Sequence, residues 1–277
     1  MPPPSPNPTP STSSYSERPL RGYEAFVYGF KRRAKLHHCL GYGTFSVDVS
    51  GLDDLRKAYC RTVTPITNVA VYVKAVALAM ARHPQANAIL FQRWYGYRIA
   101  RFDSIDVNVP ITRQIGAGDL TFIGTVRGAA EKSLAEIQAE LTALQRDPPE
   151  SLPSLQRLLW FERKPLWLAR LIHCWMSRSP RFYLRNVGTC GLTLAGDDGG
   201  DHFFPIAPTS VVFGLGGVRS EPVVRDGLIT VARILRCSLM VDNYVISGLL
   251  GGSLLEEFKT LLESGRVISD EPAKAAS

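Results

Sequence analysis

Few side chains in this sequence can exchange a proton near neutral pH, and they do not form one motif. Imidazole titrates in this range, which makes His202 and the pair His37-His38 the candidates for a general base. Cys190 has no histidine or acid next to it in sequence, so burial is expected rather than nucleophilic attack. Ser247 lacks the G-x-S-x-G context of a serine nucleophile. Any catalytic arrangement must therefore be assembled by the fold.

One stretch, residues 239–248, organises the chain. Its sequence, Leu-Met-Val-Asp-Asn-Tyr-Val-Ile-Ser-Gly, predicts an apolar strand, a tight polar bend at Asp242 and Asn243, and a helix start. Upstream, Asp226-Gly227 separates two apolar runs and predicts a hairpin. The Asn243 amide offers a carbonyl acceptor and two N–H donors but cannot take a proton near neutrality. Asp242 is expected to cap the bend.

Composition and charge narrow the class of protein. The 277 residues are 45% hydrophobic and 21% charged, which is typical of a globular domain, and no apolar run is long enough to span a bilayer. The five cysteines are scattered without Cys-x-x-Cys, which favours a reducing cytoplasm and argues against a zinc site or other metal centre. A net charge of +7 favours an anionic partner. No basic stripe is interleaved with aromatics, so we expect a phosphate-bearing molecule such as coenzyme A rather than nucleic acid.

The chain order predicts one folded domain between two tails. Residues 1–19 are rich in Pro and Ser and are expected to be disordered. The domain is expected over 20–264, followed by a flexible tail at 265–277. Helical spacing predicts helices over 22–35, 66–82 and 131–145, and alternation predicts a strand near 44–49.

Several segments resemble the catalytic core of dihydrolipoyl acyltransferases, which transfer acyl groups in 2-oxoacid dehydrogenase complexes. Residues 221–252 resemble the family pattern P-V-V-x-D-G-x-I, strand, D-H-R-V-x-D-G. Other matches are V-K-A at 73–75, H-P-x-x-N at 83–87, the strand I-x-V-N-V-x-I at 105–111 and S-L-x-E-I at 133–137, and residues 188–196 resemble the family's G-T-F-T-I-S-N-L-G. The resemblance covers about residues 20–146 and 186–264. It implies an α/β fold, a chloramphenicol-acetyltransferase-like two-layer sandwich with a mixed sheet flanked by helices. It also implies a homotrimer with substrate channels between subunits.

The resemblance implies a mechanism whose central residues are changed here. In the family, a histidine removes the proton from a thiol of coenzyme A or dihydrolipoamide, and a serine hydroxyl stabilises the oxyanion formed from the thioester. The histidine falls on Asn243, its following aspartate on Ser247, and the serine on Thr193. The arginine that pairs with that aspartate has its best match in Arg21. No separate cofactor is implied beyond an acyl thioester of coenzyme A or of a carrier protein.

Three explanations stay open. The chain can be an acyltransferase whose base is His38 or His202, or whose thiol is already ionised. It can be repurposed for a cyclisation or thioester rearrangement in which Asn243 and Thr193 polarise a carbonyl. It can also be a catalytically inactive scaffold that binds an acyl carrier or an active relative. The substrate-binding candidates that accompany these residues are Asp242, Ser247, Cys190, Phe203 and Phe204.

A Trp-rich helical segment at 147–185 has no counterpart in the family pattern. Its apolar positions include Trp160, Trp167 and Trp175 among several arginines, with a break expected at Pro165. Such a face is expected to pack on the body of the fold or on a neighbouring subunit. Residues 155–176 would also suit contact with a membrane surface or with a lipid-like acyl chain.

Overall fold

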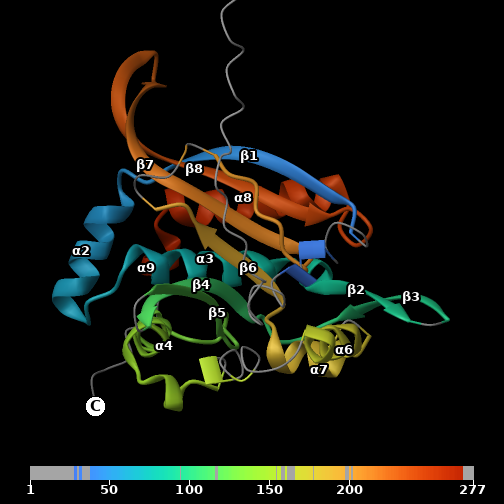
Figure 1. Cartoon of the computed structure of the whole chain (residues 1–277). Helices are drawn as coiled ribbons and strands as arrows, with labels where there is room; N and C mark the ends of the chain where they lie inside the picture. Colours follow the sequence, from blue (N-terminus) through green and yellow to red (C-terminus); the bar gives the residue numbers. More distant parts are fainter. Residues whose placement is uncertain are drawn as a thin grey trace, which may run out of the picture.

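A mixed sheet of six strands forms the centre of the computed structural model (Figure 1). The structure describes residues 28–29, 31–32, 38–93, 95–115, 118–153, 155–156, 160, 166–176, 178–196, 200 and 202–270. The strand order is β1 (Leu40–Asp48), β8 (Leu228–Asp242), β7 (Val211–Arg225), β6 (Cys190–Leu194), β4 (Val107–Ile115) and β5 (Gly118–Val126). β6 runs parallel to both of its neighbours, and the other pairs are antiparallel. The predicted mixed sheet is confirmed.

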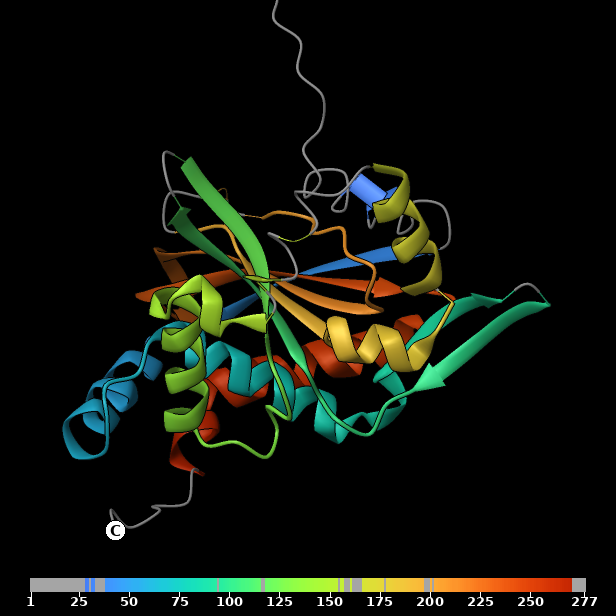
Figure 2. The same cartoon turned by 60° about the horizontal axis from the view of Figure 1, so that its bottom comes forward.

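Helices cover one face of the sheet and its edge (Figure 2). α3 (Asn68–Arg82) and α8 (Gly248–Glu263) pack together on that face, where Phe258 contacts Phe213 of β7 and Phe45 of β1. α4 (Leu134–Arg146) packs beside β4 and β5, and its start is fixed by a capping box between Ser133 and Glu136. The helices predicted over 66–82 and 131–145 are therefore confirmed.

The last helix, α9 (Arg266–Ser269), belongs to the packed part of the chain. It contacts α2 (Leu52–Thr62), and its residues Val267 and Ile268 are buried. The fold therefore continues past the domain boundary expected at residue 264. Residues 1–19 and 271–277, where tails are predicted, lie outside the described residues, as does most of the helix predicted over 22–35.

The hairpin of β7 and β8 has the turn that its sequence predicts. Asp226 and Gly227 both adopt positive φ, 51° and 78°, as a two-residue turn with matching strand twist requires. The register shifts between Leu215 and Val218, and beyond this irregularity the hairpin curls away from the sheet (Figure 1). A second, two-stranded sheet of β2 (Ala88–Arg93) and β3 (Gly96–Arg101) projects at the other end.

The segment between α4 and β6 contains short helices. Those with described bounds are the 3-10 turn Pro149–Ser151, α6 (Leu166–Met176) and α7 (Pro180–Asn186). Pro165 lies outside the described residues. Tyr183 of α7 is buried against Phe91 of β2, with ring centroids 5.5 Å apart. In the part of the chain that the structure describes, no helix is long and apolar enough to cross a membrane.

Candidate functional site: the turn between β8 and α8

The turn after β8 is closed by the backbone of Asp242, which is fully buried. Its N–H donates to the Ser210 carbonyl at 2.9 Å, and its carbonyl accepts from Val245 and Ile246 at 2.9 and 2.8 Å. Its carboxylate Oδ1 accepts from the backbone N–H groups of Cys39 and Tyr244, both at 3.1 Å. The predicted cap of the bend is therefore present.

The same carboxylate holds a histidine that is distant in sequence. Asp242 Oδ2 lies 2.6 Å from His38 Nδ1, and the two side chains are 0% and 1% exposed. Because a carboxylate only accepts hydrogen bonds, Nδ1 carries a proton, and in the neutral ring Nε2 is then the nitrogen that bears the lone pair. His38 Nε2 is buried and has no hydrogen-bond partner among the described residues. This arrangement has the orientation of an acid–histidine pair in which the carboxylate fixes the tautomer.

Asn243 follows this pair directly and is exposed. Its N–H donates to the Cys39 carbonyl at 2.7 Å, which joins the turn to the entry of β1. Its side chain lies against Gly41, where a Cβ atom would come within 2.6 Å of Asn243 Nδ2. The backbone hydrogen bond thus fixes the position of Asn243, and the absence of a side chain at position 41 leaves room for its amide.

Ser247 ends the turn as the N-cap of α8. Its hydroxyl accepts from the Leu250 N–H at 3.3 Å. This capping bond gives Ser247 a local structural role. Arg21, the expected partner of the family's aspartate at this position, lies outside the described residues.

Thr193 does not meet Asn243 within one chain. The register places Thr193 beside Gly214 of β7, which pairs with Ser238 of β8. Strand geometry then separates Thr193 from the end of β8 by roughly 15 Å. Residues paired across neighbouring strands point to one face, so Thr193, Ser238 and Asp242 all lie on the face opposite α3 and α8. Any site that uses Thr193 and Asn243 together needs a second chain.

A strap at residues 202–208 crosses this open face. Ser238 Oγ donates to the Phe203 carbonyl at 2.6 Å, and the Tyr42 hydroxyl donates to the Pro205 carbonyl at 3.0 Å. Partial burial raises the pKa of Tyr42, which keeps it a donor. Phe204 is exposed and packs edge-on against the Tyr42 ring at 5.3 Å. Phe203 therefore lies at the Gly214–Ser238 row and Phe204 on Tyr42 of β1. His202 Nδ1 is buried without a hydrogen-bond partner among the described residues.

Cys190 lies in the core at the start of β6. It is fully buried, and burial raises the pKa of its thiol to about 12, with the nearby Asp106 carboxylate adding to the effect. A thiol with this pKa is protonated and poorly nucleophilic at neutral pH. The expectation that it is packed rather than reactive fits this geometry, and its burial keeps it off any substrate-facing surface of the single chain.

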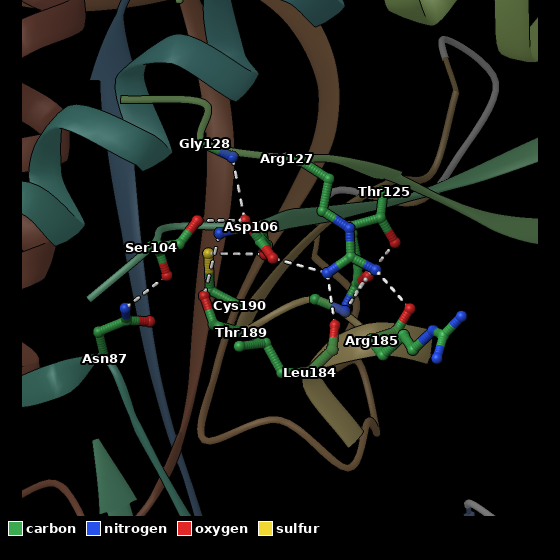
Figure 3. Close-up of polar contacts among 12 residues, drawn as sticks. Asn87, Ser104, Asp106, Thr125, Arg127, Gly128, Leu184, Arg185, Thr189 and Cys190 are labelled. Carbon is green, nitrogen blue, oxygen red and sulfur yellow. Dashed lines mark hydrogen bonds and ion pairs between the residues drawn. The ribbon is translucent and has the colours of Figure 1, made fainter. Parts of the chain in front are cut away.

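A buried polar network holds β6 in place (Figure 3). Asp106 accepts hydrogen bonds from Ser104, Arg127 and the Gly128 N–H, and its backbone pairs with Thr189. Arg127 also donates to the carbonyls of Leu184 and Arg185 at the end of α7. The network therefore connects β4 and β5 to the segment that leads into Thr193.

The comparisons with known proteins identify the family of the chain. The family model described as 2-oxoacid dehydrogenases acyltransferase (catalytic domain) matches residues 33–151 and 185–268, most of the chain. The chain belongs to this family. The gap between the two matched ranges falls on the Trp-rich segment, where the sequence predicts that the resemblance ends.

Two relatives are similar to the chain over most of its length. The lipoamide acyltransferase component of the branched-chain alpha-keto acid dehydrogenase complex of Bacillus subtilis is 22% identical over 260 residues, or 92% of this chain and 54% of the relative. The acetyltransferase component of the Rickettsia conorii pyruvate dehydrogenase complex is 25% identical over 194 residues, or 69% and 39%. The chain thus spans about half the length, or less, of these relatives.

Two solved structures share the fold. A probable dihydrolipoamide acetyltransferase from Listeria monocytogenes superposes with a TM-score of 0.67 at 20% identity, covering 96% of this chain and 99% of that one. The dihydrolipoamide acetyltransferase of Azotobacter vinelandii gives 0.69 at 19% identity, covering 97% and 100%. Crystallographic and enzymatic work on the latter concerns the roles of a serine, a histidine and an asparagine in its catalytic mechanism.

Proposed function

We propose that the chain is a divergent acyltransferase domain that handles an acyl thioester of coenzyme A or a carrier protein at the β8–α8 turn. Family membership supports acyl transfer as the reaction class. Asn243 and Ser247 then stand where the family pattern has its histidine and aspartate. The catalytic histidine and asparagine of the Azotobacter protein are numbered four apart, the same spacing as Asn243 and Ser247.

The observation that carries the proposal is the buried pair of His38 and Asp242. A general base contributes about 10² to 10⁴-fold and must present an unprotonated atom to the reacting group. Asp242 selects the tautomer in which His38 Nε2 is this atom, and Asp242 directly precedes Asn243 in the turn. The imidazole that is missing at position 243 is thereby supplied from the segment before β1.

The proposed step balances without a further cofactor. The acceptor thiol transfers its proton to His38 Nε2 as its sulfur forms a bond to the thioester carbonyl carbon. The Thr193 hydroxyl of a neighbouring subunit and the Asn243 amide donate hydrogen bonds to the resulting oxyanion, where one donor is worth roughly 3–4 kcal/mol. Collapse breaks the original carbon–sulfur bond, and the leaving thiolate takes the proton back from His38.

This role for Thr193 requires an oligomer, and we propose a homotrimer. The separation of Thr193 from Asn243 within one chain supports a site shared between subunits. Sedimentation equilibrium at micromolar concentration is expected to give three copies. Thr193→Val, which keeps the shape and removes the hydroxyl, should lower acyl transfer about 100-fold without changing the mass. A monomer would contradict the shared site.

The proposed cytoplasmic location rests on the cysteines, which are free thiols.

A catalytically inactive scaffold is the second candidate. The burial of His38 favours this candidate. Its side chain is only 1% exposed, so a thiol cannot reach Nε2 in the single chain. In this alternative the pair with Asp242 only stabilises the turn, and an acyl carrier or an active relative binds without reaction.

Acetyl transfer from acetyl-coenzyme A to dihydrolipoamide separates the two candidates. His38→Gln should lower kcat/KM about 100-fold or more, because glutamine cannot accept the proton. His83→Gln, at the end of α3 and away from the turn, is the matched control and should transfer like the wild type. If the wild type transfers no acetyl group but still binds a non-hydrolysable thioether analogue, the scaffold is correct.

A further inference from the structure

The exposed side of α6 carries large apolar side chains in a row. Trp167, Leu171 and Trp175 follow one another at intervals of four residues and are 62%, 59% and 61% exposed. This spacing places them on one helix face, and Leu168 and Ile172 lie half-buried on the side toward the rest of the protein. Proteins rarely leave several large apolar side chains exposed together unless they bind something. We define Trp167, Leu171 and Trp175 as the α6 stripe.

Much of the chain's excess positive charge lies in the sequence segment that carries this stripe. Between residues 163 and 196 there are six Lys or Arg residues and no Asp or Glu. The other 26 basic residues nearly balance the 25 acidic ones, so this segment accounts for almost all of the net charge of +7. Arg178, Arg181 and Arg185 are exposed within it.

We propose that the α6 stripe and its arginines dock the protein on an anionic lipid bilayer. Tryptophan favours the boundary between headgroups and acyl chains, where its ring is buried and its N–H stays hydrated. Each cationic side chain near an anionic surface strengthens binding about fivefold. α6 is an eleven-residue helix and cannot span the membrane, so it lies in the interface plane.

The charge favours a bilayer over a two-fold contact between copies of the chain. A two-fold contact through the stripe would place the same surface opposite itself. Arginines would then face arginines with no acidic residue between positions 163 and 196 to pair with them. α6 lies in the gap of the family match, between residues 151 and 185, so the stripe is not part of the matched sequence.

Flotation of the full-length protein with vesicles tests the proposal independently of acyl transfer. The wild type should bind vesicles of equal parts phosphatidylglycerol and phosphatidylcholine, with blue-shifted tryptophan emission, and not pure phosphatidylcholine. Changing Trp167, Leu171 and Trp175 together to Ser should weaken binding at least about tenfold. Arg178→Gln with Arg181→Gln should weaken it about 25-fold, with a smaller dependence on salt.

The control variant is Val63→Ser with Ile123→Ser. Val63 follows α2 and is 57% exposed, and Ile123 lies in β5 and is 51% exposed, so the variant removes exposed apolar side chains away from the stripe. It should bind vesicles within about twofold of the wild type. Failure of the wild type to bind anionic vesicles at low salt overturns the proposal, as does equal binding by the stripe variant. A change of sedimenting mass in the stripe variant also overturns it, because the stripe would then join copies of the chain.

Discussion

At the scale of single residues, the position of the Asn243 side chain depends on the glycine at position 41. A methyl group at position 41 would lie 2.6 Å from Asn243 Nδ2 and 3.2 Å from Cγ and Oδ1. Because the Asn243 side chain is exposed, it can move away at little cost to folding. We expect Gly41→Ala to change the free energy of unfolding by no more than about 1 kcal/mol. Acyl transfer should fall about tenfold, since the displaced amide no longer faces the thioester.

Gly252→Ala is the matched control for this prediction. A Cβ at position 252 meets no atom within 4 Å, and the residue lies inside α8. Replacing an exposed helical glycine with alanine raises the free energy of unfolding by about 1 kcal/mol. This variant should therefore unfold at a higher urea concentration than the wild type and transfer acyl groups normally. Wild-type transfer by the Gly41→Ala variant would remove Asn243 from the mechanism. Urea titration and the acetyl-transfer assay give both readouts.

The sequence identified part of the turn but not the pair that defines it. Asp242 and Asn243 are adjacent and polar within an apolar run, which is a signal that sequence alone can supply. His38 lies 204 positions before Asp242, and no local pattern connects residues so far apart. Gly41 had a usable signal, because a glycine within a strand often marks a close approach of another group.

At the scale of secondary-structure elements, Arg127 links α7 to the start of β6. Its guanidinium pairs with the Asp106 carboxylate, which is 3% exposed, and caps the carbonyls of Leu184 and Arg185. Arg127→Met leaves this carboxylate without its cation, so we expect a loss of about 2–3 kcal/mol in the free energy of unfolding. Trypsin should also cut faster after Arg178 and Arg181, because α7 loses its anchor.

Lys57→Met provides the comparison for Arg127→Met. Lys57 pairs with Asp54 between side chains that are both more than half exposed, so its removal should cost no more than about 0.5 kcal/mol. Its tryptic pattern around residues 178–185 should match that of the wild type. Unchanged protection of α7 in the Arg127→Met variant would show that α7 is held by Tyr183 and its apolar neighbours instead.

Elements with strong local signals were predicted, and those without them were not. The 66–82 helix ends at His83-Pro84, and the Asp226-Gly227 hairpin has its expected turn. The β2–β3 hairpin was missed although Gly96, with φ of 129°, stands between two runs rich in aromatic and β-branched residues. α7 was missed because its seven residues are too few to show a periodic pattern.

The alkaline stability of the whole molecule depends on its buried thiols. Burial raises the pKa of Cys190 to about 12 from an ordinary value of 9.0, and burial also raises the pKa of Cys237. Above pH 9 the unfolded chain loses protons that the folded chain keeps, so the free energy of unfolding must fall as pH rises. At pH 10 the expected loss from Cys190 alone is on the order of 1 kcal/mol.

Cys190→Ala tests this dependence. The variant is less stable at neutral pH because a packed side chain is removed, but its stability should fall less steeply between pH 9 and 11. Cys237 remains and keeps part of the slope. Urea midpoints measured across this range give the comparison. An identical slope in the variant and the wild type would mean that the Cys190 thiol ionises as readily in the folded protein as in the unfolded one.

The most direct test of the central claim is a rescue experiment on the proton acceptor. If His38 supplies the base that position 243 lacks, His38→Gln abolishes acetyl transfer and Asn243→His in the same chain restores it. The account predicts recovery of at least about tenfold in kcat/KM over the single His38→Gln variant. Equal rates for the single and double variants, or a wild type indifferent to His38→Gln, would contradict it.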